Sequence, residues 1–272
     1  MIDIEGFKTY MYEEELSKNT VESYLRGIRE YAALYDEVTK PNYIEFKRIL
    51  MEKVKPKTVN LRLCAVMKYC KYKDIPMTIK HIKTPKLTHI DNIITEEQYK
   101  RLTDGLRADG DIVNYARVQL LAKTGMRISE ARKIRKKDLY AGKVDIHTKA
   151  HMRTIYFPAS LLEDIKPYLD TLNDDDYILR NEYGRSKEKG NSLTTRGFAA
   201  ALNKMAEKYG IPGEVMHPHA FRHFFAMQFI KRKNDISLLA DLLGHGSVNV
   251  TQIYLKQSEE EQKHAVDSVV DW

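Results

Sequence analysis

The chain has 272 residues, of which 43% are hydrophobic and 31% are charged, and its formal net charge is +7. This length allows two modest domains with real cores, and the absence of any apolar run of about 18 residues excludes a membrane-spanning helix. The two cysteines form no C-x-x-C pair, which argues against a zinc site, and the N-terminus lacks the pattern of a secretory signal, so we expect a cytoplasmic protein with reduced thiols.

The first 75 residues or so carry the apolar periodicity of helices. Asn19 and Glu22 have the spacing of a capping box, and the apolar residues that follow recur every three or four positions, which predicts a helix with one buried face. A second helix is expected across 41–53, because Pro41 suits the first turn of a helix. A third helix should begin near Thr58.

Charge is distributed unevenly over this part of the chain. Residues 1–39 have a net charge of −5, whereas residues 40–90 have thirteen Lys and Arg against three Asp and Glu, a net charge of +10. Such a block is either a solvated basic face or a surface for an anionic partner, of which DNA phosphate is the usual one. Because residues 75–93 contain two prolines and no helical period, we place a helical domain at 1–78 and a basic linker at 79–93.

The second half of the chain is expected to be mainly helical with a small antiparallel sheet. Thr95 and Gln98 fit a capping box that opens this domain, which we place at 94–257. The Thr124-Gly125 pair should break residues 112–137 into two helices. The pattern predicts two hairpin strands, 143–147 and 153–157, and further helices near 160–170, 194–209, 219–233 and 235–243.

Two motifs in this domain pair an arginine with a second polar residue one helical turn away. In T-G-M-R-I-S-E, Arg127 precedes Glu130 by three positions. In H-P-H-A-F-R-H, His219 precedes Arg222 by the same spacing, so both side chains lie on one face of a helix. Taken singly, Arg127 fits a surface ion pair and His219 fits a helix start.

A third motif, L-L-G-H-G-S-V-N-V-T-Q-I-Y, places Tyr254 nine residues after His245. A lone tyrosine among the 17 of this chain would usually be a core residue, and His245 could simply cap a helix end. His217 and His223 flank the second motif, and we interpret both as supporting or structural groups. The joint occurrence of all three motifs in one order is what makes the structural interpretation improbable.

These motifs resemble those of the tyrosine recombinase (phage integrase) family, and the layout is most similar to its Xer-type members. The family pattern has an arginine in T-G-x-R-x-S-E, a lysine on a β-hairpin, H-x-x-R, and L-G-H followed by the tyrosine. Lys149 matches the hairpin lysine, although this chain reads T-K-A where many relatives read G-K-G, so Lys143 is the alternative. The N-terminal S-K-N-T-V-E-S-Y-L and T-V-N-L-R-L-C-A-V resemble the family's helical core-binding domain. The catalytic residues that the resemblance implies are Arg127, Lys149, His219, Arg222, His245 and the nucleophile Tyr254.

The chemistry of phosphodiester cleavage fits these residue types. Two guanidiniums can bind the non-bridging oxygens of the phosphate in bidentate fashion, and histidines can add hydrogen bonds. A phenol has an ordinary pKa of about 10, so Tyr254 needs a cationic pocket or a base to attack near neutral pH. Lys149 is the candidate general acid for the leaving 5′ oxygen, and Glu130 is expected to orient Arg127 or nearby backbone. We expect no metal and no cofactor.

The resemblance also implies how the protein works on DNA. We expect a clamp on double-stranded DNA with a specific recombination site, a 3′-phosphotyrosyl intermediate, and a homo-tetramer that joins two duplexes through a Holliday junction. Residues 258–272 form an acidic, amphipathic tail suited to docking on a neighbouring protomer, and an accessory protein is possible. The protein would then be associated with the nucleoid. The expected DNA contacts are Lys55, Lys57, Arg62, Lys68, Lys83 and Lys86.

Two alternatives remain open from the residues. A type IB topoisomerase uses a similar set of side chains but relaxes supercoils as a monomer, and a regulator would bind DNA without cleaving it. The sequence leaves the target site open, and with it the choice between chromosome-dimer resolution, phage integration and mobile-element transfer. The few residues before Ser17 lead us to expect no additional arm-type DNA-binding domain.

Overall fold

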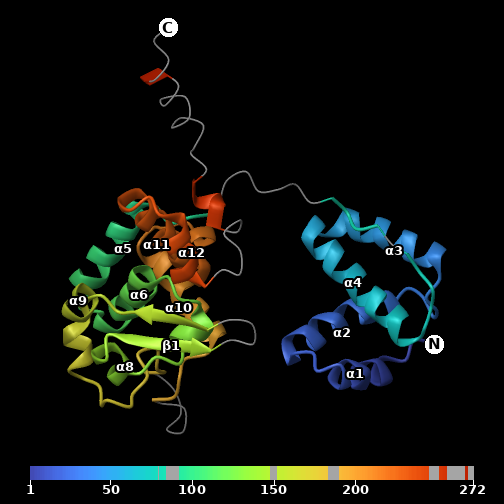
Figure 1. Ribbon diagram of the computed structural model, residues 1–272, viewed down its shortest axis with the longest axis horizontal. Coiled ribbons are helices and arrows are strands. Elements are labelled where there is room, and N and C mark those ends of the chain that lie inside the picture. Colours follow the sequence, from blue (N-terminus) through green and yellow to red (C-terminus); the bar gives the residue numbers. More distant parts are fainter. Residues whose placement is uncertain are drawn as a thin grey trace. The chain divides into compact units, whose positions relative to one another are not determined.

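The computed structural model divides the chain into two compact units, residues 1–86 and residues 87–272, here called the N-terminal unit and the C-terminal unit. Figure 1 shows each unit with its own set of helices. The structure describes residues 1–78, 80–83, 92–147, 152–182, 190–244, 251–255 and 267–268.

The described part of the N-terminal unit is made of helices: α1 (Ile4–Glu13), α2 (Lys18–Ala32), α3 (Lys40–Lys53) and α4 (Pro56–Tyr72). Their apolar faces enclose one core, in which Phe7, Tyr31 and Phe46 are among the largest fully buried side chains. The capping box predicted at Asn19 is wrong. The side chain of Ser17 caps α2 instead, accepting a hydrogen bond from the Thr20 amide, so the helix begins two residues earlier than that box requires.

The C-terminal unit is mainly helical with a two-stranded antiparallel sheet, as the sequence predicted. The nearly all-buried helix α6 lies at its centre, in contact with α5, α9 and α11. The bounds of its helices are α5 (Glu96–Ala108), α6 (Ile112–Thr124), α7 (Ile128–Ala131), α8 (Lys136–Tyr140), α9 (Ala159–Leu169), α10 (Thr195–Lys208), α11 (Pro218–Arg232) and α12 (Ile236–Leu243), with short 3-10 helices η1 (Gly213–Val215) and η2 (Gln252–Leu255). The strands are β1 (Lys143–His147) and β2 (Met152–Tyr156), paired so that Ile146 faces Arg153.

Two glycines end helices at points that matter for the site. Gly125 terminates α6 and Gly244 terminates α12, both in the left-handed region, with φ of 60° and 61°. A Cβ at Gly125 would overlap the ring of Phe225, and one at Gly244 would overlap the side chain of Arg153. The predicted break at Thr124-Gly125 is therefore confirmed, because only glycine provides this backbone conformation without a steric penalty.

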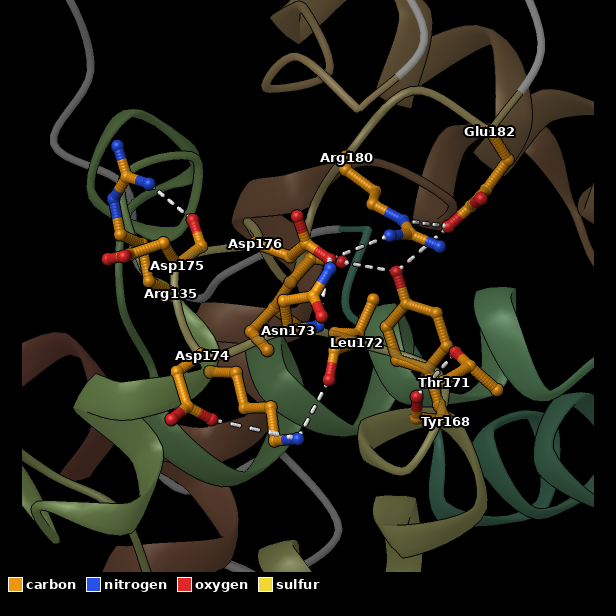
Figure 2. Close-up of polar contacts among 12 residues, drawn as sticks. Arg135, Tyr168, Thr171, Leu172, Asn173, Asp174, Asp175, Asp176, Arg180 and Glu182 are labelled. Carbon is orange, nitrogen blue, oxygen red and sulfur yellow. Dashed lines mark hydrogen bonds and ion pairs between the residues drawn. The ribbon is translucent and has the colours of Figure 1, made fainter.

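Polar contacts hold α8, which leads directly into β1, against the segment that follows α9 (Figure 2). The Arg135 guanidinium lies over the Tyr177 ring and donates to the Asp175 carbonyl oxygen. Farther along this segment, Arg180 is paired with Asp176 at 3.0 Å and with Glu182 at 2.8 Å. This network fixes the base of the β1–β2 hairpin on the rest of the unit.

Candidate active site

Arg127 lies in the turn between α6 and α7, where it is the residue that precedes the first turn of α7. Its Nη1 is 3.2 Å from Glu130 Oε1, and its Nη2 donates to the carbonyl oxygen of Gly244 at 3.3 Å. The side chain is still 36% exposed. Glu130 and the Gly244 carbonyl thus hold the guanidinium on one side, and its other side is open to solvent.

Glu130 is buried behind Arg127. One carboxylate oxygen, Oε2, accepts hydrogen bonds from the backbone N–H of Arg127 at 2.7 Å and from Nη2 of Arg153 at 2.5 Å. Burial raises the pKa of Glu130, but the Arg127 amide and the two guanidiniums outweigh it, so the pKa lies below its ordinary value. The carboxylate is therefore ionised and bridges two arginines.

Arg222 lies on α11 and is almost fully buried. It donates to the carbonyl oxygens of Gly125 at 2.9 Å and Leu243 at 2.6 Å. Burial, together with the charges of Arg127 and Arg153, lowers its pKa to about 10, so it stays cationic at neutral pH. Arg127 and Arg222 bond to adjacent carbonyls, those of Gly244 and Leu243, and the fold therefore brings the two predicted phosphate-binding arginines together.

The histidines of the H-P-H-A-F-R-H motif have different positions. His219 lies one turn before Arg222 and is exposed overall; partial burial of its ring, followed by the charge of Arg222, lowers its pKa. His217 caps α11, because its Nδ1 accepts from the Ala220 amide at 3.1 Å. His219 is thus placed to reach a ligand near Arg222, whereas His217 has the structural role that the sequence indicated.

Tyr254 lies in η2 and is only 4% exposed, packed against Ala226 and Leu243. Its hydroxyl is 2.7 Å from Nδ1 of His223. Burial raises the pKa of Tyr254 to about 12, opposed in part by the charge of Arg222. Burial, and then the charge of nearby His219, lowers the pKa of His223 to about 4. A neutral imidazole therefore accepts a hydrogen bond from a protonated phenol, and the tyrosine is shielded from solvent.

Lys149, His245 and Lys86 lie outside the described residues, as does nearly all of the tail 258–272. Lys143, the alternative to Lys149, is exposed at the start of β1, opposite Tyr156.

The sequence interpretation missed two residues of the site. His223 was taken only as a supporting group, yet it contacts the hydroxyl of Tyr254 directly. Arg153 was not singled out at all, yet its guanidinium binds Glu130. In β2 the buried residues alternate with less buried ones, and an arginine at a buried position of a strand is a signal of an ion pair.

The predicted DNA-contacting residues of the N-terminal unit differ in their surroundings. Lys55, Lys57 and Lys83 are exposed. Arg62 is buried, with its Nε 2.7 Å from Glu30, and Lys68 is mostly buried, with its Nζ 2.8 Å from Glu14. Arg62 and Lys68 each form an ion pair with a carboxylate of the same unit, so a DNA phosphate would have to compete with that carboxylate.

Over the part of the chain that the structure describes, no cluster of three or more His, Cys, Asp or Glu side chains is arranged to hold a metal ion. Within the same residues, no helix combines the length and apolarity that crossing a membrane requires.

Comparison with known proteins identifies relatives over the whole chain. Residues 92–261 match the model of the phage integrase family. The tyrosine recombinase XerA of Pyrococcus furiosus is 30% identical over 271 residues, covering 97% of this chain and 92% of the relative. Among solved structures, the Tn1549 transposon integrase in complex with transposon right end DNA is similar in fold, with a TM-score of 0.73, 14% identity and 99% of each chain covered. A lambda integrase tetramer bound to a Holliday junction gives a TM-score of 0.68 at 13% identity, covering 91% of this chain and 74% of that one.

Proposed function

Because the chain belongs to the phage integrase family of tyrosine recombinases, we propose that it cleaves and rejoins DNA at a specific site with Tyr254 as its nucleophile. One observation carries this proposal. Arg222 and Arg127 meet at the end of α12, where they bind the carbonyls of Leu243 and its cap Gly244, and the hydroxyl of Tyr254 is bound to His223, the residue that follows Arg222. A phosphate bound by the two guanidiniums would therefore lie near the buried phenol of Tyr254.

The arginines would act on the charge that develops during cleavage. Attack by the phenolate oxygen on phosphorus forms a P–O bond and breaks the P–O5′ bond through a pentacovalent state with extra negative charge. Guanidiniums aimed at the two non-bridging oxygens stabilise that state, with an added hydrogen bond from His219. Arg127 keeps an open face for this purpose, and Arg222 is held by two carbonyls in a fixed orientation.

Proton transfers complete the reaction. The phenol must lose its proton, and the pKa of about 12 in the free protein opposes this loss. DNA binding therefore has to move Tyr254, or change the charges around it, before attack. Lys149 would give a proton to the 5′ oxygen as it leaves. The 3′-phosphotyrosyl bond conserves the energy of the phosphodiester, so a 5′ hydroxyl from another strand can rejoin the DNA without ATP.

Recombination further requires two duplexes, and we infer four identical protomers that exchange strands through a Holliday junction. The similarity in fold to a lambda integrase tetramer bound to such a junction supports this assembly. We also propose that the tail 258–272 docks on the neighbouring protomer, since a heterologous contact repeated around a ring can close. The exposed Lys55, Lys57 and Lys83 would bind DNA phosphates with the salt sensitivity of counterion release.

The test uses a nicked suicide substrate, from which the cleaved strand dissociates and traps the covalent complex. Tyr254→Phe should leave DNA binding unchanged and abolish the adduct, because only the nucleophilic oxygen is removed. Tyr156→Phe, at an exposed tyrosine on β2, is the matched control and should form adduct at the wild-type rate. An adduct that persists in Tyr254→Phe refutes the assignment. Absence of adduct in the wild type would instead favour a non-catalytic regulator, and relaxation of a plasmid without any specific site would favour a topoisomerase.

A further inference from the structure

Arg153 is the second residue of β2, and its side chain is only 6% exposed. Its Nη2 is 2.5 Å from Glu130 Oε2, and its Nη1 donates to the carbonyl oxygen of Leu242. Burial lowers the pKa of this arginine, and the charge of Glu130 opposes the effect. Such a buried cation is costly to maintain unless it is paired, and here a carboxylate and a helix carbonyl pair it.

The last two carbonyls of α12 and the carbonyl of its cap, Gly244, are each bound by a different arginine. Arg153 binds Leu242, Arg222 binds Leu243, and Arg127 binds Gly244. The C-terminal end of a helix carries partial negative charge, which makes it a favourable place for cations. One helix end therefore fixes three guanidiniums in neighbouring positions.

Glu130 is shared between two of these arginines. Its Oε2 forms an ion pair with Nη2 of Arg153 at 2.5 Å, whereas its Oε1 is farther, 3.2 Å, from Nη1 of Arg127. Arg153 thus neutralises most of the buried carboxylate, and Arg127 keeps an exposed side chain whose donors are not all engaged by the described residues. Without Arg153, the carboxylate would have Arg127 as its remaining cationic partner among the described residues, and a tightened ion pair would compete with a phosphate for that guanidinium.

We propose that Arg153 is a positioning residue for DNA cleavage, which keeps Arg127 available to the scissile phosphate by neutralising Glu130 and anchoring the end of α12. This inference rests on the proposed function, in which Arg127 binds that phosphate. Arg153 also joins the hairpin strand β2 to the α7 and α12 segments, so three parts of the site are held by one side chain.

The experiment measures single-turnover cleavage of the nicked substrate at saturating DNA, together with the Kd for the uncleaved site. Arg153→Met should slow cleavage by about 10- to 100-fold, less than the 10²–10³ typical for loss of a direct oxyanion donor, with the Kd changed by less than about 3-fold. Arg153→Lys should recover part of the rate, because an ammonium can still pair with Glu130 but cannot span to Leu242.

Removing the competing charge should restore activity. The double variant Arg153→Met with Glu130→Gln should cleave faster than Arg153→Met alone, because no buried carboxylate then holds Arg127. A substrate with a methylphosphonate at the scissile position has one charged oxygen fewer, so the defect of Arg153→Met relative to wild type should shrink on it by at least about 3-fold.

Arg180→Met is the matched control, since Arg180 is likewise a doubly paired arginine of the C-terminal unit with most of its side chain buried, but it belongs to the network in Figure 2. It should not change the ratio of rates on the two substrates. Equal defects of Arg153→Met on phosphate and methylphosphonate, or no gain from Glu130→Gln in a variant that folds as wild type by circular dichroism, overturn the inference. The proposed function fails separately, if Tyr254→Phe still forms the adduct.

Discussion

Replacing His223 with asparagine should make the stability of the C-terminal unit less sensitive to mild acid. In the folded protein, burial and nearby cationic or ionisable groups lower the pKa of His223 to about 4 from its ordinary 6.5. Between these values the unfolded chain binds a proton at this residue and the folded chain does not. The stabilising contribution is therefore complete above pH 6.5 and is lost as the pH falls toward 4.

The magnitude follows from the two pKa values. Linkage gives about 1.4 kcal/mol lost at pH 5.5 relative to pH 7.5, which we reduce to about 1 kcal/mol because the ring is partly exposed to solvent. For a unit of this size, that corresponds to about 2–4 °C in Tm. Asparagine retains a neutral acceptor for the Tyr254 hydroxyl but binds no proton, so its own contribution does not change over this range.

The assay is urea unfolding of the full chain at pH 7.5 and pH 5.5, followed by circular dichroism. Between the two pH values His223→Asn should lose about 1 kcal/mol less stability than the wild type. His81→Asn is the control, because His81 is an exposed histidine of the N-terminal unit, and this variant should follow the wild type. If His223→Asn loses as much stability on acidification as the wild type, the buried neutral imidazole is not the source of the effect.

Three further predictions concern the site and its assembly. Lys149→Ala should slow cleavage, and a 5′-thio leaving group, which needs no acid, should restore the rate; without restoration, Lys143 becomes the candidate acid. Removal of residues 258–272 should weaken synapsis more than binding to a single site, and intact recombination would contradict tail docking. Gly244→Ala should lower the free energy of unfolding, measured by thermal unfolding, by about 1–3 kcal/mol. The loss should exceed that of Gly110→Ala, because Gly110 also has positive φ (66°) but has open space around a Cβ. Equal losses would show that the Arg153 side chain moves aside at no measurable cost.

Local features of the chain were predictable because they depend on residues close together in sequence. The Thr95 and Gln98 capping box is present in the structure as the spacing indicated. The hairpin forms at the expected place, with its second strand one residue earlier than predicted. The prediction failed where two local signals competed, since Ser17 rather than Asn19 caps α2. The sequence therefore determined the element order, the mainly helical fold and the motif residues by which the family is identified.

Tertiary structure alone decided which partners these residues have. Arg62 pairs with Glu30 across 32 positions, Arg153 with Glu130 across 23, and His223 with Tyr254 across 31. No helical or strand period encodes a contact at such a separation, because it depends on how α2 meets α4, how β2 reaches Glu130 of α7 and contacts α12, and how η2 meets α11. The sequence by itself thus identified the family and the candidate side chains for cleaving DNA. The packing of the chain decided that two of its cations are already neutralised, that one carboxylate serves two arginines, and that the free protein keeps its tyrosine protonated.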